Sequence, residues 1–363
     1  MHRNMASGAF WVAFAASLGK VATFATQIVL GWLLSKEDFG TYAIVLSIGA
    51  SVAVLRNGGT QQLLIQRGVN FDEHAPAIFK FGLAFNILAF VLLIALAMRA
   101  ARFYEIPELV PLASLLALSI ILASPGLILR AQVALSGRFR SLALVTATSD
   151  VTRQVLTILF AVLGFGVYSF MFPLALEPLI LMTLLYLVSR SWPRSRHVPL
   201  QEYVGIFRES RWIMLSNLAI AARLNGPYFV ISLFEAKALL GVYFFAAQLV
   251  VSLTTMFSTA INEVVFPSLS KVVDHTSSHH GIFLKAARAS ITIGACVSLA
   301  LIAVGSPIIE LVWNGKWDES IGCVAVLATT FAPVILIVLC LATLASRGLW
   351  KPRLAVLITA AAL

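Results

Sequence analysis

Charged residues are scarce in this sequence: 12% are Asp, Glu, Lys or Arg, against about a quarter in soluble globular proteins. Hydrophobic residues make up 60% of the chain, and its mean hydropathy is +0.93. This balance excludes a soluble globular protein and predicts an integral membrane protein. Strands of alternating polarity are also missing, and long apolar runs are separated by short polar loops, so the pattern favours a helical bundle over a β-barrel.

The motifs of several other functional classes are absent. The three cysteines stand in apolar surroundings without metal-ligand spacing, and His275, His279 and His280 lack the Cys or acidic partners of a zinc site. No glycine-rich phosphate loop is found, which argues against ATP hydrolysis. The first apolar run is too long for a cleavable signal peptide. We therefore expect no metal and no cofactor.

Ten apolar segments are long enough to cross a bilayer, because a spanning helix needs about 20 residues. They cover residues 6–34, 40–66, 75–98, 109–129, 142–164, 167–189, 212–234, 238–266, 282–304 and 320–345.

Basic residues are distributed unevenly between the two ends of these segments. Of 26 Lys and Arg residues, seventeen fall at or near the segment ends on the side of the N-terminus, five on the opposite side and four well inside the segments. Cytoplasmic loops are enriched in Lys and Arg, so we predict a multi-pass protein with a cytoplasmic N-terminus. The net charge of +10 then reflects topology, and no nucleic-acid partner is expected. All seven tryptophans lie near predicted segment ends, as in an aromatic belt at the lipid headgroups.

A basic connection divides the chain into two lobes. We predict a first lobe of six transmembrane helices at residues 1–189 and a cytoplasmic amphipathic linker at 190–211. The second lobe, residues 212–363, then has four helices and an incomplete one. A solvated linker without a helix is an equally good interpretation of 190–211.

A weak internal repeat relates the lobes at an offset of 201 residues. Trp11 corresponds to Trp212, and Phe39-Gly40-Thr41-Tyr42 corresponds to Leu240-Gly241-Val242-Tyr243. Six segments separate the copies, so both lobes have the same orientation and are related by a pseudo-two-fold axis along the membrane normal. The predicted fold class is an all-α polytopic membrane protein with two such lobes; chance matching in apolar sequence is the alternative.

Several of these stretches carry a family resemblance. The stretch from Gly31 to Gly68 resembles the first hairpin of the Wzx-type polysaccharide flippases of the multidrug/oligosaccharidyl-lipid/polysaccharide (MOP) exporter superfamily, and that from Leu240 to Lys271 is similar to the hairpin of the second lobe. Similar family loops are Arg130-Ala131-Gln132 with Gly137-Arg138-Phe139-Arg140, and Trp313-Asn314-Gly315-Lys316-Trp317.

The resemblance implies twelve or fourteen helices and translocation of undecaprenyl-diphosphate-linked sugar units, of O-antigen, lipopolysaccharide or exopolysaccharide, across the inner membrane. A polysaccharide polymerase and a chain-length regulator are the implied partner proteins, beside the lipid-linked oligosaccharide and membrane lipid. Where relatives commonly carry an acidic residue, the chain has Arg56-Asn57-Gly58-Gly59. The second lobe stops early, so we expect a fragment; the alternative is a short form completed by another chain.

Four cations lie inside the segments, where hydrocarbon excludes charge. We predict that Lys20, Arg56 and Arg223 bind the substrate diphosphate, because Arg binds phosphate bidentately and Lys acts as a mobile point charge. Pairing with an acid or a backbone carbonyl is the alternative for each. For Arg153, neutralisation by Asp150 at i−3 is the favoured interpretation.

Uncharged polar residues and buried acids complete the candidate site. The amides predicted to bind sugar hydroxyls, or simply to bridge helices, are Asn217, Asn225, Gln248 and Asn262. Asp150, Glu177 and Glu263 are candidates for coupling to H⁺ or Na⁺, although Glu177 also suits a pairing with Arg153. Pro125-Gly126 and Asn225-Gly226-Pro227 are candidate hinges or static kinks.

Three other functional classes remain as alternatives. A membrane enzyme of polysaccharide assembly, a polymerase or glycosyltransferase, would need a long outer loop, and the outer loops here are short. A related exporter of cationic small molecules would need a cleft dominated by acids rather than by cations. A purely structural membrane subunit is the third. The favoured prediction is a non-enzymatic flippase that works by alternating access.

Overall fold

The protein is helical throughout the part of the chain that the computed structural model describes. These residues are 2–56, 71–190, 198–234, 236–270 and 276–346, with 352, 355–357 and 359. The helices are α1 (His2–Leu33), α2 (Lys36–Ser51), α4 (Phe71–Phe103), α5 (Leu109–Leu135), α6 (Phe139–Val162), α7 (Tyr168–Ser189), α8 (Leu200–Phe234), α9 (Lys237–Ser270), α10 (Thr276–Trp313), α11 (Ser320–Thr329) and α12 (Phe331–Ser346).

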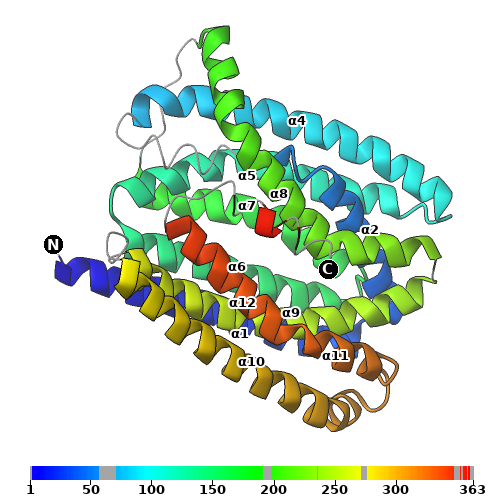
Figure 1. Ribbon diagram of the computed structural model, residues 1–363. Helices are drawn as coiled ribbons and strands as arrows, with labels where there is room; N and C mark the ends of the chain where they lie inside the picture. The colour runs from blue at the N-terminus through cyan, green and yellow to red at the C-terminus, as the bar shows by residue number, and fades with distance from the viewer. Residues whose placement is uncertain are drawn as a thin grey trace. The chain divides into compact units, whose positions relative to one another are not determined.

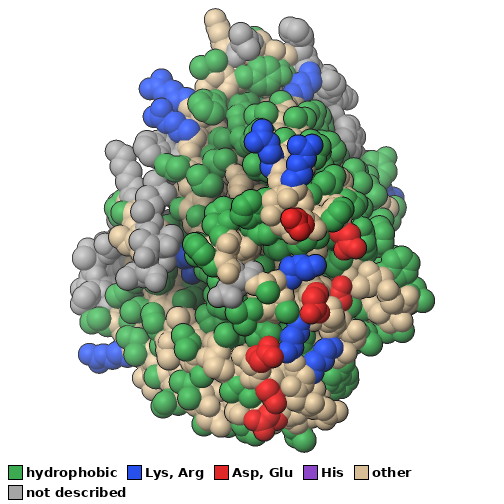
Figure 2. Space-filling view, turned by 90° about the vertical axis from the view of Figure 1, so that its right-hand side faces the viewer, with side chains coloured by type: hydrophobic (Ala, Val, Ile, Leu, Met, Phe, Trp, Pro, Cys, Tyr) green, Lys and Arg blue, Asp and Glu red, His purple; other side chains and the backbone are tan. Residues whose placement is uncertain are grey.

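A helix lies at each of the ten predicted segments, and the last segment is divided between α11 and α12. Within the described residues, five helices are long and apolar enough to cross a membrane, or six if the bent pair α11 and α12 is one span. These five lie in α4, α5, α7, α9 and α10. Large hydrophobic side chains are exposed along α4 and α10, among them Val91, Leu299 and Leu311, and Figure 2 shows hydrophobic side chains spread between the charged groups. Such exposed apolar surface suits contact with lipid.

Contacts between Cα atoms divide the chain into two compact units. Unit 1 comprises Met1–Ala15 and Thr41–Phe234, and unit 2 comprises Ala16–Gly40 and Glu235–Leu363. The lobe boundaries at 1–189, 190–211 and 212–363 stay a prediction, and the contact units differ from them at two places. Residues 16–40 fall in unit 2, and the whole of α8 falls in unit 1.

Unit 1 is a bundle in which α5 packs between α4 and α7, and α6 packs on α7 (Figure 1). The fully buried Asn86 of α4 fastens α4 to α5: its amide donates to the Ile120 carbonyl at 3.2 Å and to the Ser124 hydroxyl at 2.8 Å. On the other side of α5, Gly126 lies next to the α7 backbone, where an added Cβ would stand in ordinary van der Waals contact, 3.9 Å from the Met182 Cα. Although Pro125 lies inside α5 and Pro227 inside α8, both helices continue through them.

The helix predicted in the linker is the first part of α8. It starts at Leu200 and continues without a break to Phe234; no proline stands in residues 200–226 to end it. Phe207 stacks on Phe85 of α4 with 6.4 Å between ring centroids, and Ile206 is fully buried. The amphipathic segment therefore packs on α4 and is continuous with the seventh segment.

In unit 2, three side chains from the end of α10 and the loop that follows it bind the C-terminal end of α1. We call them the tryptophan clasp: Trp313, Lys316 and Trp317. The Trp313 indole donates to the Ile28 carbonyl at 3.1 Å, and the Trp317 indole donates to the Gly31 carbonyl at 2.8 Å. The Lys316 ammonium donates to the carbonyls of Trp32 at 3.0 Å and Leu34 at 2.7 Å. These bonds occupy carbonyls at the C-terminal end of α1, where a cation is also favoured by the helix dipole.

The sequence of the clasp loop explains its conformation. Asn314 and Gly315 both have positive φ, 49° and 80°, a region that Gly and Asn tolerate better than other residues. Two such residues in succession turn the chain and aim Lys316 and Trp317 back at α1. Burial and the neighbouring Lys36 lower the pKa of the Lys316 ammonium, while Asp38 opposes this shift.

The aromatic-belt prediction is wrong for two tryptophans. Trp317 is fully buried and Trp313 is 5% exposed; the Trp317 ring stacks on Phe245 at 3.9 Å and packs edge-on to Phe39 at 5.1 Å between centroids. Their indole N–H groups bond to protein carbonyls rather than to lipid headgroups. Trp32, by contrast, is 55% exposed.

A symmetric crossing of α2 and α9 lies beside the clasp. A Cβ on Gly40 would overlap the Lys237 carbonyl, and a Cβ on Gly241 would overlap the Lys36 carbonyl. Both pairs of residues, 36 with 237 and 40 with 241, are related by the offset of 201 that the sequence repeat predicts. The contact is therefore reciprocal, in agreement with a repeat at this point; the two-fold relation between whole lobes stays a prediction.

The tenth segment bends by 43° between α11 and α12. Pro333 lacks an N–H to bond the Thr329 carbonyl and its ring crowds that carbonyl, so the α-helical ladder stops there. Ser298 of α10 donates to the preceding carbonyl, that of Ala328, at 2.7 Å. One turn earlier, Gly294 permits this approach, because an added Cβ would meet the Ala332 Cα at 2.8 Å.

Candidate functional site

Polar side chains follow one face of α6 in unit 1. Ser149, Gln154 and Thr157 are each less than 9% exposed, and Asp150 and Arg153 are half-buried beside them. Residues three or four apart share a helix face, so this set forms a polar stripe on an otherwise apolar helix. The Thr157 hydroxyl donates a hydrogen bond to the Arg153 carbonyl of its own helix at 2.8 Å.

The stripe meets a carboxylate of α7. The Arg153 Nη1 atom lies 3.4 Å from the Glu177 Oε2 atom, and the two side chains are 32% and 24% exposed. The structure thus brings Glu177 to Arg153, the pairing that the sequence left open beside neutralisation by Asp150. Asp150 also lies close enough to act on Glu177 as a like charge.

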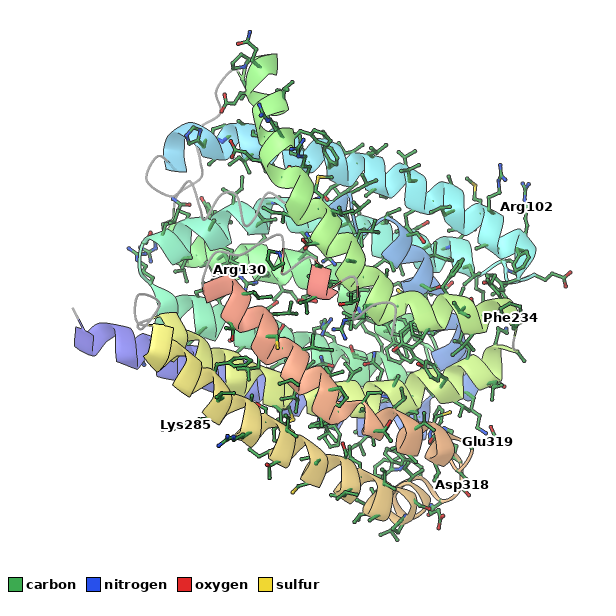
Figure 3. All side chains as sticks on the ribbon, viewed as in Figure 1. Arg102, Arg130, Phe234, Lys285, Asp318 and Glu319 are labelled. Atoms are coloured by element: carbon green, nitrogen blue, oxygen red, sulfur yellow. The ribbon has the colours of Figure 1, made fainter. Side chains whose placement is uncertain are left out.

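Two further arginines act electrostatically on the same carboxylate. Arg56, which follows α2, and Arg130 of α5 both contribute to the environment of Glu177; Arg130 is labelled in Figure 3. We call Arg56, Arg130, Asp150, Arg153 and Glu177 the central cluster. The cluster contains three guanidinium groups and two carboxylates, so its own described members carry one excess positive charge when both acids are ionised.

An aromatic pair borders the central cluster. Tyr42 of α2 is influenced by the charges of Arg153 and Glu177. Its ring stacks on Phe170 of α7, with centroids 4.3 Å apart and planes at 9°. The pair joins α2 to α7 next to the charged side chains.

The central cluster retains unused donor capacity. The Arg153 Nε atom and the Ser149 hydroxyl are buried without a hydrogen-bond partner among the described residues, and the Arg56 side chain is exposed. An unmet buried donor costs about 1–3 kcal/mol, and phosphate oxygens satisfy several guanidinium N–H groups at once. The arrangement can therefore accept an anion with several oxygens.

The candidate residues of α8 are also in unit 1. Arg223 is half-buried, makes no ion pair within the described part of the chain, and its Nε atom is buried without a partner there. Asn225 donates one side-chain N–H to the Ala221 carbonyl of its own helix at 3.1 Å. Its second N–H and its side-chain carbonyl can then bind a sugar hydroxyl. Asn217 is half-buried.

The remaining candidates lie in unit 2. Lys20 and Gln248 are half-buried on α1 and α9, so the structure does not bring Lys20 and Arg56 together in one unit. Asn262 and Glu263 lie in α9, but their side chains are outside those that the structure describes.

Sequence reasoning missed three members of this site. The sequence places Arg130 in a loop, because the fourth predicted segment ends at residue 129. In the structure α5 continues to Leu135, and the chain turns at Gly137, which has a φ of 69°. Tyr42 was noticed only as part of the repeat. Ser149 carried a signal that could have been used, since it stands one turn before Arg153 in a run of Thr, Ser, Asp, Arg and Gln.

Comparisons with known proteins agree with this architecture. Residues 29–322 match the protein family described as polysaccharide biosynthesis protein. The chain is 25% identical over 304 residues to the succinoglycan biosynthesis transport protein ExoT of Rhizobium meliloti, covering 83% of this chain and 61% of ExoT. It is 23% identical over 323 residues to an uncharacterized membrane protein in the cps region of Klebsiella pneumoniae, covering 85% of this chain and 64% of that protein.

Among solved structures, the outward-facing conformation of a multidrug resistance MATE family transporter of the MOP superfamily superposes with a TM-score of 0.59 at 14% identity, covering 97% of this chain and 84% of that chain. This likeness shows the fold. The chain spans a little under two thirds of the length of the two curated relatives that it matches. The family match and the apolar helices identify it as a multi-pass membrane protein. The chain belongs to the polysaccharide biosynthesis protein family.

Proposed function

We propose that this protein is a flippase, not an enzyme, that moves an undecaprenyl-diphosphate-linked oligosaccharide from the inner to the outer leaflet of the inner membrane by alternating access. One observation carries the proposal: in unit 1, Glu177 lies 3.4 Å from Arg153 and in the electrostatic field of two further arginines, Arg56 and Arg130. The N-terminus is cytoplasmic in this proposal, in keeping with the seventeen basic residues on its side.

The energetic cost of the central cluster supports a functional role. Each charged side chain at a helix centre costs roughly 2.5–3.5 kcal/mol on insertion scales, and the 3.4 Å pair of Arg153 and Glu177 offsets only part of this cost. The uncompensated positive charge and the unpaired Arg153 Nε atom suit a diphosphate. An inside-negative membrane potential then favours outward movement by about 2.3 kcal/mol per negative charge and 100 mV.

The sugar part of the substrate needs hydrogen-bonding groups rather than cations. We assign this role to the amides of Asn217, Asn225, Gln248 and Asn262, with Lys20 and Arg223 as further phosphate ligands. Coupling to H⁺ or Na⁺ is assigned to Asp150, Glu177 and Glu263. A polysaccharide polymerase and a chain-length regulator are the proposed partners that receive the translocated unit.

Neutralising the predicted phosphate ligands tests the proposal. The Arg56→Gln and Arg223→Gln variants should each abolish surface polysaccharide in the native host while the protein remains in the membrane at normal abundance. Arg102→Gln is the matched control, because Arg102 is exposed at the end of α4 (Figure 3) and should leave polysaccharide unchanged. Normal polysaccharide in both test variants would remove Arg56 and Arg223 from the substrate site.

A reconstituted assay separates the flippase from the enzyme alternative. Proteoliposomes that contain a polyprenyl-diphosphate-linked oligosaccharide should show the unaltered lipid becoming accessible in the opposite leaflet. Appearance of a new glycosidic product without transfer between leaflets would overturn the proposal in favour of a polymerase or glycosyltransferase.

A further inference from the structure

Glu177 occupies the position where an anionic ligand of the arginines would be expected. Its carboxylate contacts Arg153 at 3.4 Å and lies in the field of Arg56 and Arg130, so all three guanidinium groups that define the central cluster act on this one acid.

The contact leaves Arg153 incompletely bonded. The ion pair with Glu177 is made by Nη1, while Nε of the same guanidinium is buried without a partner among the described residues. A planar guanidinium has five N–H donors, and a phosphate group binds two of them side by side. Glu177 therefore satisfies Arg153 less fully than a phosphate would.

Two features of the surroundings make this contact replaceable. Asp150 repels the Glu177 carboxylate as a like charge, against the attraction of Arg153. Glu177 also stands between Pro173 and Pro178 inside α7, and each proline removes one backbone hydrogen bond from the helix. The backbone that carries Glu177 is thus less constrained than an ordinary helical turn.

From this geometry we propose that Glu177 is a displaceable internal counter-ion, which neutralises Arg153 in the unloaded protein and gives way to the diphosphate of the substrate. This inference rests on the proposed function. It adds a selection rule: an incoming anion must bind the arginines more favourably than the Glu177 carboxylate does. A phospholipid phosphodiester carries one negative charge, as Glu177 does, and gains nothing by exchange. A diphosphate carries at least two and can also engage Arg56 and Arg130.

The rule explains how a cationic site avoids occupation by the bulk anionic lipids of its own membrane. Removing the carboxylate removes the threshold, so a phosphodiester lipid then competes with the diphosphate. It follows that Glu177 sets the specificity of the site rather than its capacity to bind anions.

Binding of geranylgeranyl diphosphate to the purified full chain, measured by calorimetry with and without phosphatidylglycerol, tests the inference. Glu177→Gln should bind the diphosphate about three- to fivefold more tightly than the wild type, as expected for loss of one competing, partly exposed ion pair. Phosphatidylglycerol should then weaken diphosphate binding in Glu177→Gln but not in the wild type. Unchanged or weaker diphosphate binding in Glu177→Gln would overturn the proposal.

Glu108→Gln is the matched control, because it removes the same charge from an exposed carboxylate of unit 1 that lies outside the central cluster. It should change diphosphate affinity by about twofold or less and should not create competition by phosphatidylglycerol. Equal effects of the two variants would mean that net charge alone matters, and the counter-ion role would fall.

Two further outcomes keep the tests distinct. If Glu177→Gln shows no cooperative thermal unfolding, diphosphate binding is measured on Glu177→Asp instead. Its shorter carboxylate should also strengthen diphosphate binding, and an unchanged affinity would overturn the inference. If the folded wild type binds no diphosphate at all, the proposed substrate fails, and the inference fails with it. Binding in the wild type without any effect of Glu177 rejects the inference alone.

Discussion

The crossing of Gly40 and Gly241 predicts a large effect from the smallest possible side chain. An alanine Cβ at Gly241 would overlap the Lys36 carbonyl and would also press on the Gly40 nitrogen at 2.9 Å. Both obstacles are backbone atoms, so no side-chain rotation can relieve them. The Gly241→Ala variant must push α9 away from α2 and disturb the buried Phe39, Phe244 and Phe245 beside it.

The magnitude follows from two opposing terms. Replacing a helical Gly by Ala gains about 1 kcal/mol of helix stability, whereas overpacking costs about 1–3 kcal/mol, and contact with backbone puts this site at the upper end. Gly322→Ala is the matched control, because Gly322 also lies near the start of a helix in unit 2 and has nothing within 4 Å of its added Cβ. The propensity gain cancels between the variants, which leaves a difference of about 3 kcal/mol.

Thermal unfolding in detergent, followed by tryptophan fluorescence, measures this difference. At about 2 °C per kcal/mol, Gly241→Ala should unfold about 6 °C below Gly322→Ala. Because the contact is reciprocal, Gly40→Ala should match Gly241→Ala, and the double variant should cost less than the sum, since one displacement relieves both overlaps. Equal unfolding temperatures for Gly241→Ala and Gly322→Ala would refute this account of the crossing.

Two smaller predictions concern unit 2. Ser298→Ala removes the hydrogen bond to the Ala328 carbonyl and should lower stability by about 1 kcal/mol; no change in the unfolding temperature would show that the bent pair does not need this bond. Lys316→Met keeps the aliphatic stem but loses both hydrogen bonds to the carbonyls of Trp32 and Leu34 at the end of α1. The backbone amides at the end of α1 should therefore be less protected from hydrogen exchange. Protection equal to the wild type would contradict the role given to this ammonium.

The positions of the helices could be predicted from the sequence, because a run of about 20 apolar residues has few other stable states in a bilayer. Their ends were harder to place. The fourth segment was ended at residue 129, whereas α5 continues to Leu135, since an amphipathic helix end looks like a loop when only hydropathy is read. The break before α12 was missed although Pro333 marked it, because prolines inside α5 and α8 leave those helices continuous.

Tertiary pairing could not be read from spacing along one helix. Asp150 at i−3 was the obvious partner for Arg153, yet the structure also brings Glu177 to it from α7, and only the packing of α6 on α7 decides this. The tryptophans show the same limit. A tryptophan near a segment end suits either a headgroup or a buried carbonyl, and the Asn-Gly turn that aims Trp317 at α1 lies in the backbone conformation rather than in composition.

The helices that hydropathy identifies least well are those that carry much of the candidate site. Neither α6 nor α8 is among the helices apolar enough to count as spans. Each has charges within the predicted segment: Asp150 and Arg153 in α6, and Arg223 in α8. The same groups that weaken the insertion of a helix supply the donors that an anionic substrate needs, and neighbouring apolar helices such as α5 and α7 must hold them in place. In a membrane protein of this kind, the least apolar of the predicted segments are therefore the first places to look for a polar site.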